Sequence, residues 1–326
     1  MARSFNPPTF VAGVDLGGTW LRVGLAGPDG EVRHRDKART AAAEGPAGVL
    51  AQIAGLVREA VAAEPEAELS RLVLAIGVPG PLDRGAGVVE GAPNLPGWRR
   101  VPVRDRLEAM LGCRCLVEHD ANLGAVAEHR RGAGRGTQDF VYVTVSTGIG
   151  AGLILNGQLY RGHQGSAGEF GHIVIVPDGP LCNCGNRGCL EAVASGTAIA
   201  RDAGVSSASE VGRLAAAGDP GAQAILSRAA RYLGLALGGL INLLNPEVVA
   251  LGGGVVGSSP QFFTDVLASI SNSSFPSVRS TCRVVRAELG EEQGLLGAVE
   301  LASDFARERA VPVAKVAVPC AAAAVD

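Results

Sequence analysis

The feature that most constrains the fold is a pattern that occurs near the start of the chain and again in its middle. Residues 10–26 read FVAGVDL, GGT and WLRVGLA, which is an apolar segment, a glycine turn and a second apolar segment. Residues 140–155 repeat this order as FVYVTV, STG and IGAGLIL. Short apolar runs on either side of a glycine turn are typical of paired strands. The repeat therefore predicts two related lobes that face each other across a cleft.

Helical and strand patterns alternate through the rest of the chain, which indicates the α/β class. The expected elements are a helix over 46–63, a buried strand over 71–78, a helix near 103–111, a strand over 114–118, a helix from 120 to about 131, a mostly helical region over 197–244 and a closing helix over 291–308. We expect an N-terminal lobe over 1–119, a C-terminal lobe over 120–290 and a low-complexity tail over 309–326.

Charge and hydropathy exclude several classes of protein. The 29 Lys and Arg residues nearly balance the 32 Asp and Glu residues, so the net charge of −3 lacks the basic field that a nucleic-acid-binding protein needs. The apolar run at the start is short and is broken by Pro7 and Pro8, unlike that of a signal peptide. The richest apolar segment, 229–244, contains Arg231 and Asn242, so we expect a buried core helix rather than a membrane span. We expect a cytoplasmic protein without nucleic-acid or membrane partners.

Three glycine-rich turns follow apolar strands, at 15–19 (DLGGT), 146–150 (STGIG) and 251–256 (LGGGVV). Backbone N–H groups at such turns approach phosphate oxygens closely because glycine has no Cβ atom. Thr19 and Thr147 add a hydroxyl to the first two turns, so we expect that pair to hold one triphosphate between the lobes. A plain turn is the alternative for each of them, since the chain has 46 glycines. The third turn alone is a weak signal for a dinucleotide, because it lacks a well-placed acidic residue about 20 positions later.

Three of the seven cysteines lie within the segment CNCGNRGC, and a histidine precedes them. His172, Cys182, Cys184 and Cys189 have the spacing H-x9-C-x-C-x4-C. One imidazole and three thiolates make a four-coordinate shell that suits Zn²⁺. Since four protein ligands leave no open position for a reacting water, we expect a structural zinc ion. Three buried thiols beside a core histidine are the alternative.

Two acidic residues, Glu169 and Glu191, lie on either side of this loop in the sequence. A metal-bound imidazole has a fixed orientation, and its second nitrogen can donate a hydrogen bond to a defined point. Carboxylates accept hydrogen bonds from sugar hydroxyl groups. We therefore expect the zinc loop to hold a surface that binds a sugar. Solvated loop carboxylates are the alternative for both acids.

Taken together, the segments DLGGT, HDAN, STGIGAG, GEFGH and CNCGNRGCLE resemble those of the ROK family of repressors, open reading frames and kinases, from about residue 10 to 305. The resemblance implies the two-lobed actin–hexokinase (ribonuclease H-like) ATPase fold with a structural zinc loop, and a C-terminal helix that packs back on the N-terminal lobe. Repressors of the family carry a helix-turn-helix domain before the first glycine turn. Because only 14 residues precede Asp15, we expect a kinase. The resemblance implies one that uses ATP and Mg²⁺ to convert glucose to glucose 6-phosphate.

The same resemblance implies roles for single residues. Asp120 would be the general base that accepts the proton of the sugar 6-hydroxyl, and Asp15 would help to bind hydrated Mg²⁺. The expected nucleotide contacts are Asp15, Gly17, Gly18, Thr19, Thr147, Gly148, Gly150, Gly253 and Gly254, with Gly253 and Gly254 on the adenosine side. The expected sugar contacts are Asn94, His119, Asp120, Glu169, His172 and Glu191. A helix N-cap is the alternative for Asp120, and a plain turn residue is the alternative for Asn94.

His119 departs from the family pattern, which usually has Asn before the catalytic Asp. An imidazole is bulkier than an amide, and it can gain a proton near neutral pH. The histidine either replaces the amide as a donor, or it makes sugar affinity depend on pH or shifts the preference among epimers.

Several functions stay open at this point. The acceptor could be mannose, fructose, N-acetylmannosamine or N-acetylglucosamine, and polyphosphate could replace ATP. A sugar-sensing regulator without turnover would have lost Asp120 or carry a DNA-binding extension. A zinc-dependent hydrolase would need an open metal position. The resemblance also implies a homodimer or a homotetramer.

Overall fold

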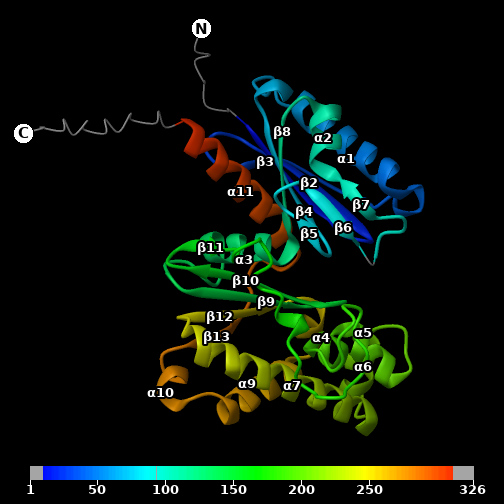
Figure 1. Ribbon diagram of the computed structural model, residues 1–326, viewed down its shortest axis with the longest axis vertical. Coiled ribbons are helices and arrows are strands. Elements are labelled where there is room, and N and C mark those ends of the chain that lie inside the picture. The colour runs from blue at the N-terminus through cyan, green and yellow to red at the C-terminus, as the bar shows by residue number, and fades with distance from the viewer. Residues whose placement is uncertain (1–9, 93, 311–326) are drawn as a thin grey trace, which may run out of the picture.

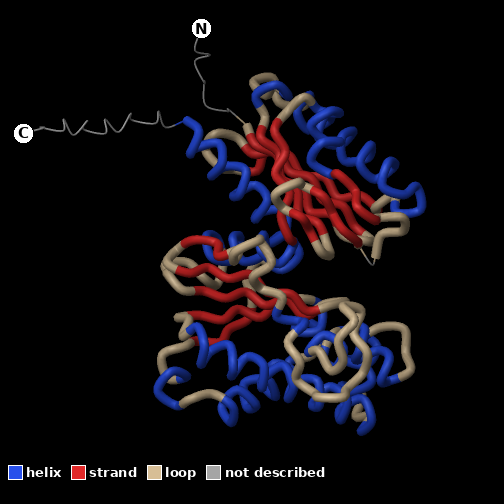
Figure 2. The backbone as a smooth tube through the Cα atoms, viewed as in Figure 1, coloured by secondary structure: helices blue, strands red, loops and turns tan. Residues whose placement is uncertain are grey.

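The computed structural model describes residues 10–92 and 94–310. Two five-stranded sheets form the centres of two lobes, which lie one above the other in Figures 1 and 2. The strands of the first sheet are β1 (Val11–Leu16), β2 (Trp20–Ala26), β3 (Val32–Arg39), β4 (Val73–Val78) and β8 (Arg114–His119). Those of the second sheet are β9 (Phe140–Val145), β10 (Ile149–Leu155), β11 (Gln158–Tyr160), β12 (Val248–Gly252) and β13 (Arg283–Arg286).

The two sheets have the same topology. The strand order is β3-β2-β1-β4-β8 in the first sheet and β11-β10-β9-β12-β13 in the second. In each sheet the first three strands along the chain pair antiparallel, and two later strands add in parallel on the other side. Burial along β1 and β9 also agrees, with the single half-exposed position of each strand at Asp15 and at Thr144. The duplication predicted from the sequence is confirmed.

Helices cover both faces of the N-terminal sheet, because successive side chains of an extended strand point to opposite faces. Helices α1 (Gly45–Ala62) and α2 (Val103–Leu111) pack on the face that carries Val14. Helix α11 (Gln293–Ala310) packs on the opposite face, which carries Val11. The closing helix that we expected over 291–308 is therefore α11, which is preceded by a short 3₁₀ turn.

Helices α3 (Asp120–Arg131) and α11 lie between the two sheets (Figure 1). Ala125 of α3 packs on the C-terminal sheet, whereas α11 packs on the N-terminal sheet. The two helices cross closely because residue 297 is glycine: a Cβ atom there would lie 2.0 Å from the backbone oxygen of Leu123. This helix pair is the interface through which one lobe rests on the other.

The other face of the C-terminal sheet is covered by the helices that follow the cysteine loop. They are α4 (Leu190–Ala194), α5 (Gly196–Ala203), α6 (Ala208–Ala216), α7 (Pro220–Leu244), α8 (Gly254–Ser258), α9 (Pro260–Ser273) and α10 (Pro276–Arg279). By length and composition alone, α7 could cross a membrane, but half of its most apolar window is buried inside the protein. Leu233, Leu237 and Ile241 of α7 pack in the C-terminal core, so the expected core helix is confirmed.

The chain passes between the lobes twice, from β8 into α3 and from β13 into α11. The first connection runs directly into α3, and the second is held against α3 by hydrogen bonds. The buried carboxylate of Glu128 accepts hydrogen bonds from the backbone N–H groups of Ala133, Glu288 and Leu289. Arg130 also donates to Glu300 of α11 at 2.9 Å. The lobe boundaries themselves stay a prediction, and residues 311–326 of the expected tail lie outside the described residues.

A third, smaller sheet projects from the N-terminal lobe, and we did not predict it from the sequence. Its strands are β5 (Leu82–Asp83), β6 (Val88–Gly91) and β7 (Arg99–Pro102), in that order. These strands are too short to carry a clear period of two residues. The sheet is relevant to the site because its first two strands form one wall of the cavity described below.

Candidate functional site

The first glycine turn connects β1 to β2 and is closed by its own backbone. The N–H of Gly17 donates to the oxygen of Trp20 at 2.9 Å, and the hydroxyl of Thr40 donates to the oxygen of Gly17 at 2.8 Å. Asn94 rests on this turn: a Cβ atom at Gly18 would lie 2.8 Å from the Cβ and the backbone oxygen of Asn94. The structure thus places an expected sugar contact directly against an expected phosphate contact.

Asp15, at the end of β1, is a half-buried carboxylate beside a single arginine. Arg22 donates to it at 3.2 Å and also pairs with Glu291 at 2.6 Å. Desolvation raises the pKa of Asp15 to about 6 although Arg22 acts in the opposite direction, and the charge of Asp120 raises this pKa further. Asp15 and Asp120 are therefore electrostatic neighbours, and a divalent cation at this point would relieve their repulsion.

Asp120 is the first residue of α3, and His119 occupies the N-cap position without a capping side-chain hydrogen bond. The N-cap alternative for Asp120 is therefore wrong, although its carboxylate does accept from the N–H of Ala121 at 2.7 Å. The side chain is exposed, yet protein surrounds it densely enough that desolvation raises its pKa. The charge of His119 lowers this pKa and the charge of Glu169 raises it, so both side chains lie near the carboxylate.

The second glycine turn connects β9 to β10 and is held by residues that follow the cysteine loop. One carboxylate oxygen of Glu191, Oε2, accepts from the N–H of Ile149 at 2.9 Å. The hydroxyl of Thr197 donates to the oxygen of Thr147 at 2.8 Å. A Cβ atom at Gly148 would lie 2.4 Å from Oε2 of Glu191, so the carboxylate in this position packs directly against the glycine. The turn and the segment 191–197 form one unit.

The third glycine turn lies beside the second one. Gly253 has a φ of 90° and precedes α8, which begins at Gly254. A Cβ atom at Gly253 would lie 2.3 Å from the backbone oxygen of Val145, at the end of β9. Gly150 lies on β10 against α3, where its Cβ position is 3.1 Å from the Cβ of Ala121. The second turn is thus flanked by the third turn and by the helix that carries Asp120.

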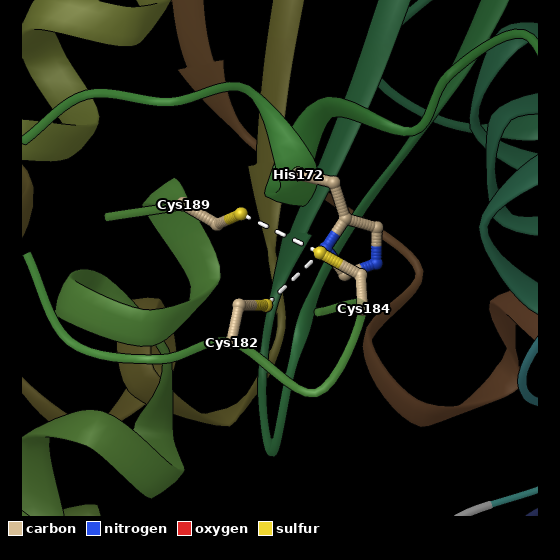
Figure 3. Close-up of side chains that lie close together, drawn as sticks. All are labelled: His172, Cys182, Cys184 and Cys189. Carbon is tan, nitrogen blue, oxygen red and sulfur yellow. Dashed lines mark hydrogen bonds between the residues drawn. The ribbon is translucent and has the colours of Figure 1, made fainter. Parts of the chain in front are cut away.

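The predicted metal ligands converge in space. The side-chain ligand atoms of His172, Cys182, Cys184 and Cys189 all lie within 4.8 Å of one another, and Figure 3 shows the three sulfur atoms and the imidazole facing a common point. The Sγ atoms of Cys184 and Cys189 are 3.6 Å apart, close to the roughly 3.8 Å edge of a tetrahedron with zinc–sulfur bonds of about 2.3 Å. Burial raises the pKa of the Cys189 thiol to about 12, so its thiolate needs a cation beside it. The donor set and its geometry fit zinc, and the cluster could hold that ion.

The two nitrogens of the His172 imidazole face different groups, one the cysteine cluster and the other Glu169. Its Nδ1 lies 3.6 Å from the Sγ of Cys182, on the metal side. Its Nε2 faces outward and lies 3.8 Å from the carboxylate of Glu169. A ligand on Nδ1 fixes the ring, so Nε2 is presented to the outside in one orientation.

A cavity of about 360 Å³ lies on the outward side of these residues, between β5–β6 and the loop before His172. It is lined by Pro81, Leu82, Asp83, Glu90, His119, Gln164, Ser166 and Glu169. The structure therefore brings together His119 and Glu169, with Asp120 and His172 as their neighbours. Asn94 and Glu191 are placed instead on the first and second glycine turns.

These features agree with the comparison of the whole chain with known proteins. A model of the ROK family matches residues 11–305. The chain belongs to the ROK family. It is 37% identical over 314 residues to the glucokinase of Thermotoga maritima, an overlap that covers 90% of this chain and 98% of that protein. The predicted family is confirmed.

Solved structures of ROK proteins share the fold. A ROK hexokinase from Thermus thermophilus has a TM-score of 0.81 at 37% identity, and the match covers 92% of this chain and 99% of that one. A ROK family glucokinase from Streptomyces griseus, in complex with glucose and AMPPNP, has a TM-score of 0.74 at 31% identity with the same coverage. A xylose repressor of Bacillus subtilis is also related, at 28% identity over 90% of this chain and 77% of the repressor. The predicted actin–hexokinase fold is confirmed, and this ROK protein is an ATP-dependent sugar kinase.

One group of this ROK kinase was missed in the sequence. Glu118, directly before His119, is fully buried, and its Oε2 accepts from Nε of Arg84 at 3.1 Å and from Nε of Arg161 at 2.8 Å. Its Oε1 accepts from Asn122 at 2.9 Å. The two arginines hold the pKa of Glu118 below its usual range in spite of burial. Arg84 follows β5 and Arg161 follows β11, so Glu118 joins both walls of the cavity. An acidic residue directly after the apolar run Cys115–Val117 of β8 was the signal that could have revealed it.

Proposed function

We propose that this ROK kinase transfers the γ-phosphoryl group of ATP to the 6-hydroxyl of glucose, with Asp120 as the general base. One observation carries the proposal: the carboxylate of Asp120 is an electrostatic neighbour both of Asp15, at the first glycine turn, and of Glu169, beside the outward nitrogen of His172. The reacting hydroxyl must lie between a phosphate site and a sugar site, and these two neighbours support that position for Asp120.

Asp120 would accept the proton of the 6-hydroxyl as the oxygen attacks the γ-phosphorus, while the bond to the β,γ-bridging oxygen breaks and ADP leaves. A raised pKa makes a carboxylate a stronger base, provided that it is ionised at the working pH. Desolvation of Asp120 has this effect. Closure of the two lobes would exclude water, which otherwise competes with the sugar as an acceptor.

The nucleotide would lie along the three glycine turns. The N–H groups of Gly18 and Gly148, with the hydroxyls of Thr19 and Thr147, would bind phosphate oxygens. The N–H of Gly17 already donates to the oxygen of Trp20, so Gly17 would contribute only the close approach that the absence of a Cβ atom allows. Gly150 supports the second turn, and Gly253 and Gly254 would face the adenosine. Asp15 would bind Mg²⁺ through its water shell, and Mg²⁺ supplies charge neutralisation of the phosphates when it is bound.

The sugar hydroxyls would be bound by Asn94, His119, Glu169, His172 and Glu191. A zinc ion at the cysteine cluster would supply no reaction step, because its four protein ligands close its shell. The protein's own contribution is the orientation of Nε2 of His172 as a hydrogen-bond donor. A cytoplasmic location and a homodimer or homotetramer remain parts of the proposal.

The identity of the sugar is the least constrained part, because His119 lines the cavity where the family usually has Asn. Mannose, fructose and N-acetylhexosamines are the alternatives within the same chemistry, and a regulator without turnover is the alternative outside it.

A coupled assay for ADP release, run over a panel of these sugars with ATP or polyphosphate, tests the proposal. We expect the highest kcat/KM with glucose and ATP, and loss of turnover in Asp120→Asn. Turnover that survives in Asp120→Asn would remove the proposed base, and a higher kcat/KM with another sugar would replace glucose.

A further inference from the structure

Glu191 is an expected sugar contact, yet one of its two carboxylate oxygens contacts the second glycine turn, which we expect to bind phosphate. Oε2 accepts from the backbone N–H of Ile149 at 2.9 Å. Within the described part of the chain, Oε1 makes no hydrogen bond that competes with an incoming hydroxyl. One side chain therefore has one oxygen committed to the second glycine turn and one oxygen free for a ligand.

The contact is built into the local structure. Cys189 is the N-cap of α4, and Glu191 is the second residue of that helix. The cysteine loop therefore determines the position of the Glu191 backbone. Gly148 leaves the space that Oε2 occupies, since a Cβ atom there would lie 2.4 Å from it. The backbone of Glu191 thus belongs to a helix and its partner N–H to the second glycine turn.

Neighbouring contacts extend the same connection. The N–H of Gly196 donates to the oxygen of Ser146 at 2.7 Å, and the hydroxyl of Thr197 donates to the oxygen of Thr147 at 2.8 Å. These two bonds orient carbonyl oxygens, whereas the bond that Glu191 accepts orients the N–H group of Ile149. A carboxylate that accepts a backbone N–H makes a charge-assisted bond, which is stronger than a neutral one.

We propose that Glu191 is a positioning residue for the ATP phosphates as well as a sugar contact, so that sugar and nucleotide bind with positive cooperativity through one carboxylate. A sugar hydroxyl on Oε1 would restrict the side chain, which restricts the Ile149 backbone and the N–H groups of Thr147 and Gly148 beside it. Cooperativity of this kind is reciprocal: the factor by which sugar strengthens nucleotide binding equals the factor by which nucleotide strengthens sugar binding. The sugar half of this inference rests on the proposed function.

Glu169 provides a matched comparison within the same site. It is also an acidic residue expected to bind sugar, and it lies beside His172 at 3.8 Å. Its carboxylate is exposed on the cavity side and makes no hydrogen bond to the second glycine turn in the described structure. A variant of Glu169 should therefore weaken the sugar alone.

The test measures the affinity of the full-length protein for a non-hydrolysable ATP analogue with Mg²⁺, by isothermal titration calorimetry, with and without saturating glucose. We expect glucose to strengthen analogue binding at least about fivefold in the wild type. In Glu191→Ala, analogue binding without sugar should weaken about tenfold and the effect of glucose should vanish. Glu191→Gln, whose amide oxygen can still accept from Ile149, should stay within about threefold of the wild type without sugar.

Each outcome decides a separate point. Analogue binding by Glu191→Ala that equals the wild type without sugar would overturn the positioning role. Loss of analogue affinity in Glu169→Gln to the same extent would show a general disturbance of the site and would also overturn it. Failure of the wild type to bind any sugar would instead remove the proposed function, while the nucleotide result without sugar would still stand.

A control for folding keeps the result interpretable. Melting temperature and zinc content of each variant identify a loss of structure. Should Glu191→Ala not fold, Glu191→Asp serves in its place, because the shorter side chain keeps the charge but withdraws it from Ile149. It should then lose analogue affinity without sugar, and unchanged affinity would contradict the proposal.

Discussion

The first two glycine turns occupy the same place in two sheets of identical topology, but they are supported differently. The first turn is closed by contacts within its own lobe, from Trp20 and Thr40. The second is held, also within its own lobe, by Glu191 and Thr197, which follow the cysteine loop. Duplication of the sheet thus fixes where the turns lie, whereas the chain that connects the strands decides what each turn is joined to.

The difference arises in one corresponding connection. In the N-terminal lobe, the chain from β3 to β4 contains Thr40, which bonds the first turn directly, and α1, which packs on the sheet. In the C-terminal lobe, the chain from β11 to β12 contains the cysteine loop and helices α4 to α7. The second turn should therefore depend on the metal cluster, and the first should not.

The largest expected effect concerns Asp120, which belongs to neither turn. Its substitution should affect the rate of phosphoryl transfer much more than the affinity for either substrate. Asp120→Asn should lower kcat by about 10³-fold, because an amide cannot accept the proton. Affinities for glucose and for an ATP analogue should change only a few-fold, which single-turnover kinetics and calorimetry would measure. His119→Asn is the matched control, since it alters the adjacent residue and restores the usual amide. It should keep kcat within about threefold, and an equal loss of kcat in both variants would refute the assignment.

The second prediction tests the dependence of the second turn on the metal cluster. Cys184→Ser replaces the exposed member of the cluster and should lower zinc content, melting temperature and nucleotide affinity, the last by about tenfold or more. Hydrogen exchange followed by mass spectrometry should show faster exchange over residues 146–149 and unchanged exchange over 17–19. Cys282→Ser, which changes a half-buried thiol outside the cluster, should leave both segments as in the wild type. Faster exchange in both turns would erase the contrast between the lobes.

The third prediction concerns Asp15, the charged residue at the half-exposed position of β1, whose counterpart in β9 is uncharged. Burial raises the pKa of Asp15 from an ordinary value of 3.8 to about 6. Its contribution to stability is therefore fully present below about pH 4 and is lost as the pH rises through about 6. Asp15→Asn should match the wild type near pH 4. It should exceed the wild type in free energy of unfolding by at most about 3 kcal/mol at pH 7.5 without Mg²⁺, while losing activity.

Thr144 occupies the corresponding position of the second sheet and carries no titratable group. Thr144→Ser should therefore change the free energy of unfolding by an amount that does not vary with pH. Urea unfolding of both variants from pH 4 to 7.5 measures the contrast. A pH-independent difference for Asp15→Asn would contradict the burial of its charge.

The smallest expected effect concerns Glu118, which joins the two cavity walls through Arg84 and Arg161. Glu118→Gln keeps the size of the side chain but weakens both ion pairs, and it should raise the KM for glucose about tenfold with a smaller change in kcat. The KM for ATP should stay within about twofold, because no contact of Glu118 reaches either glycine turn in the described structure. Coupling between Glu118→Gln and Arg161→Met in a double-mutant cycle measures the connection directly. Additive effects would show that Glu118 does not link the walls.

Much of the fold followed from periodicity and from the repeat. The helix over 103–111 and the start of the helix at Asp120 are placed as predicted, because apolar residues recur at helical spacing in both segments. The small sheet β5-β6-β7 was missed since its strands are two to four residues long. Short strands are stabilised by their partners rather than by their own pattern.

The site divides in the same way. The sequence spacing identified the four candidate metal ligands, because their residue types are those that zinc prefers and three of them lie within one short segment. The contact of Glu191 with the second glycine turn could not be predicted from the sequence. Its partner is the backbone N–H of Ile149, 42 residues away, and every residue except proline has such a group. Glu118 was missed for a similar reason: Arg84 and Arg161 lie on different lobes, and only the folded chain brings them to it.

The most direct measurement is a crystal structure of the protein with glucose and a non-hydrolysable ATP analogue. We expect the glucose 6-hydroxyl to lie within about 2.6–3.2 Å of the Asp120 carboxylate, and Glu191 to contact both a sugar hydroxyl and the N–H of Ile149. A sugar bound away from Asp120, or a second glycine turn released from Glu191 when the nucleotide is bound, would contradict this expectation.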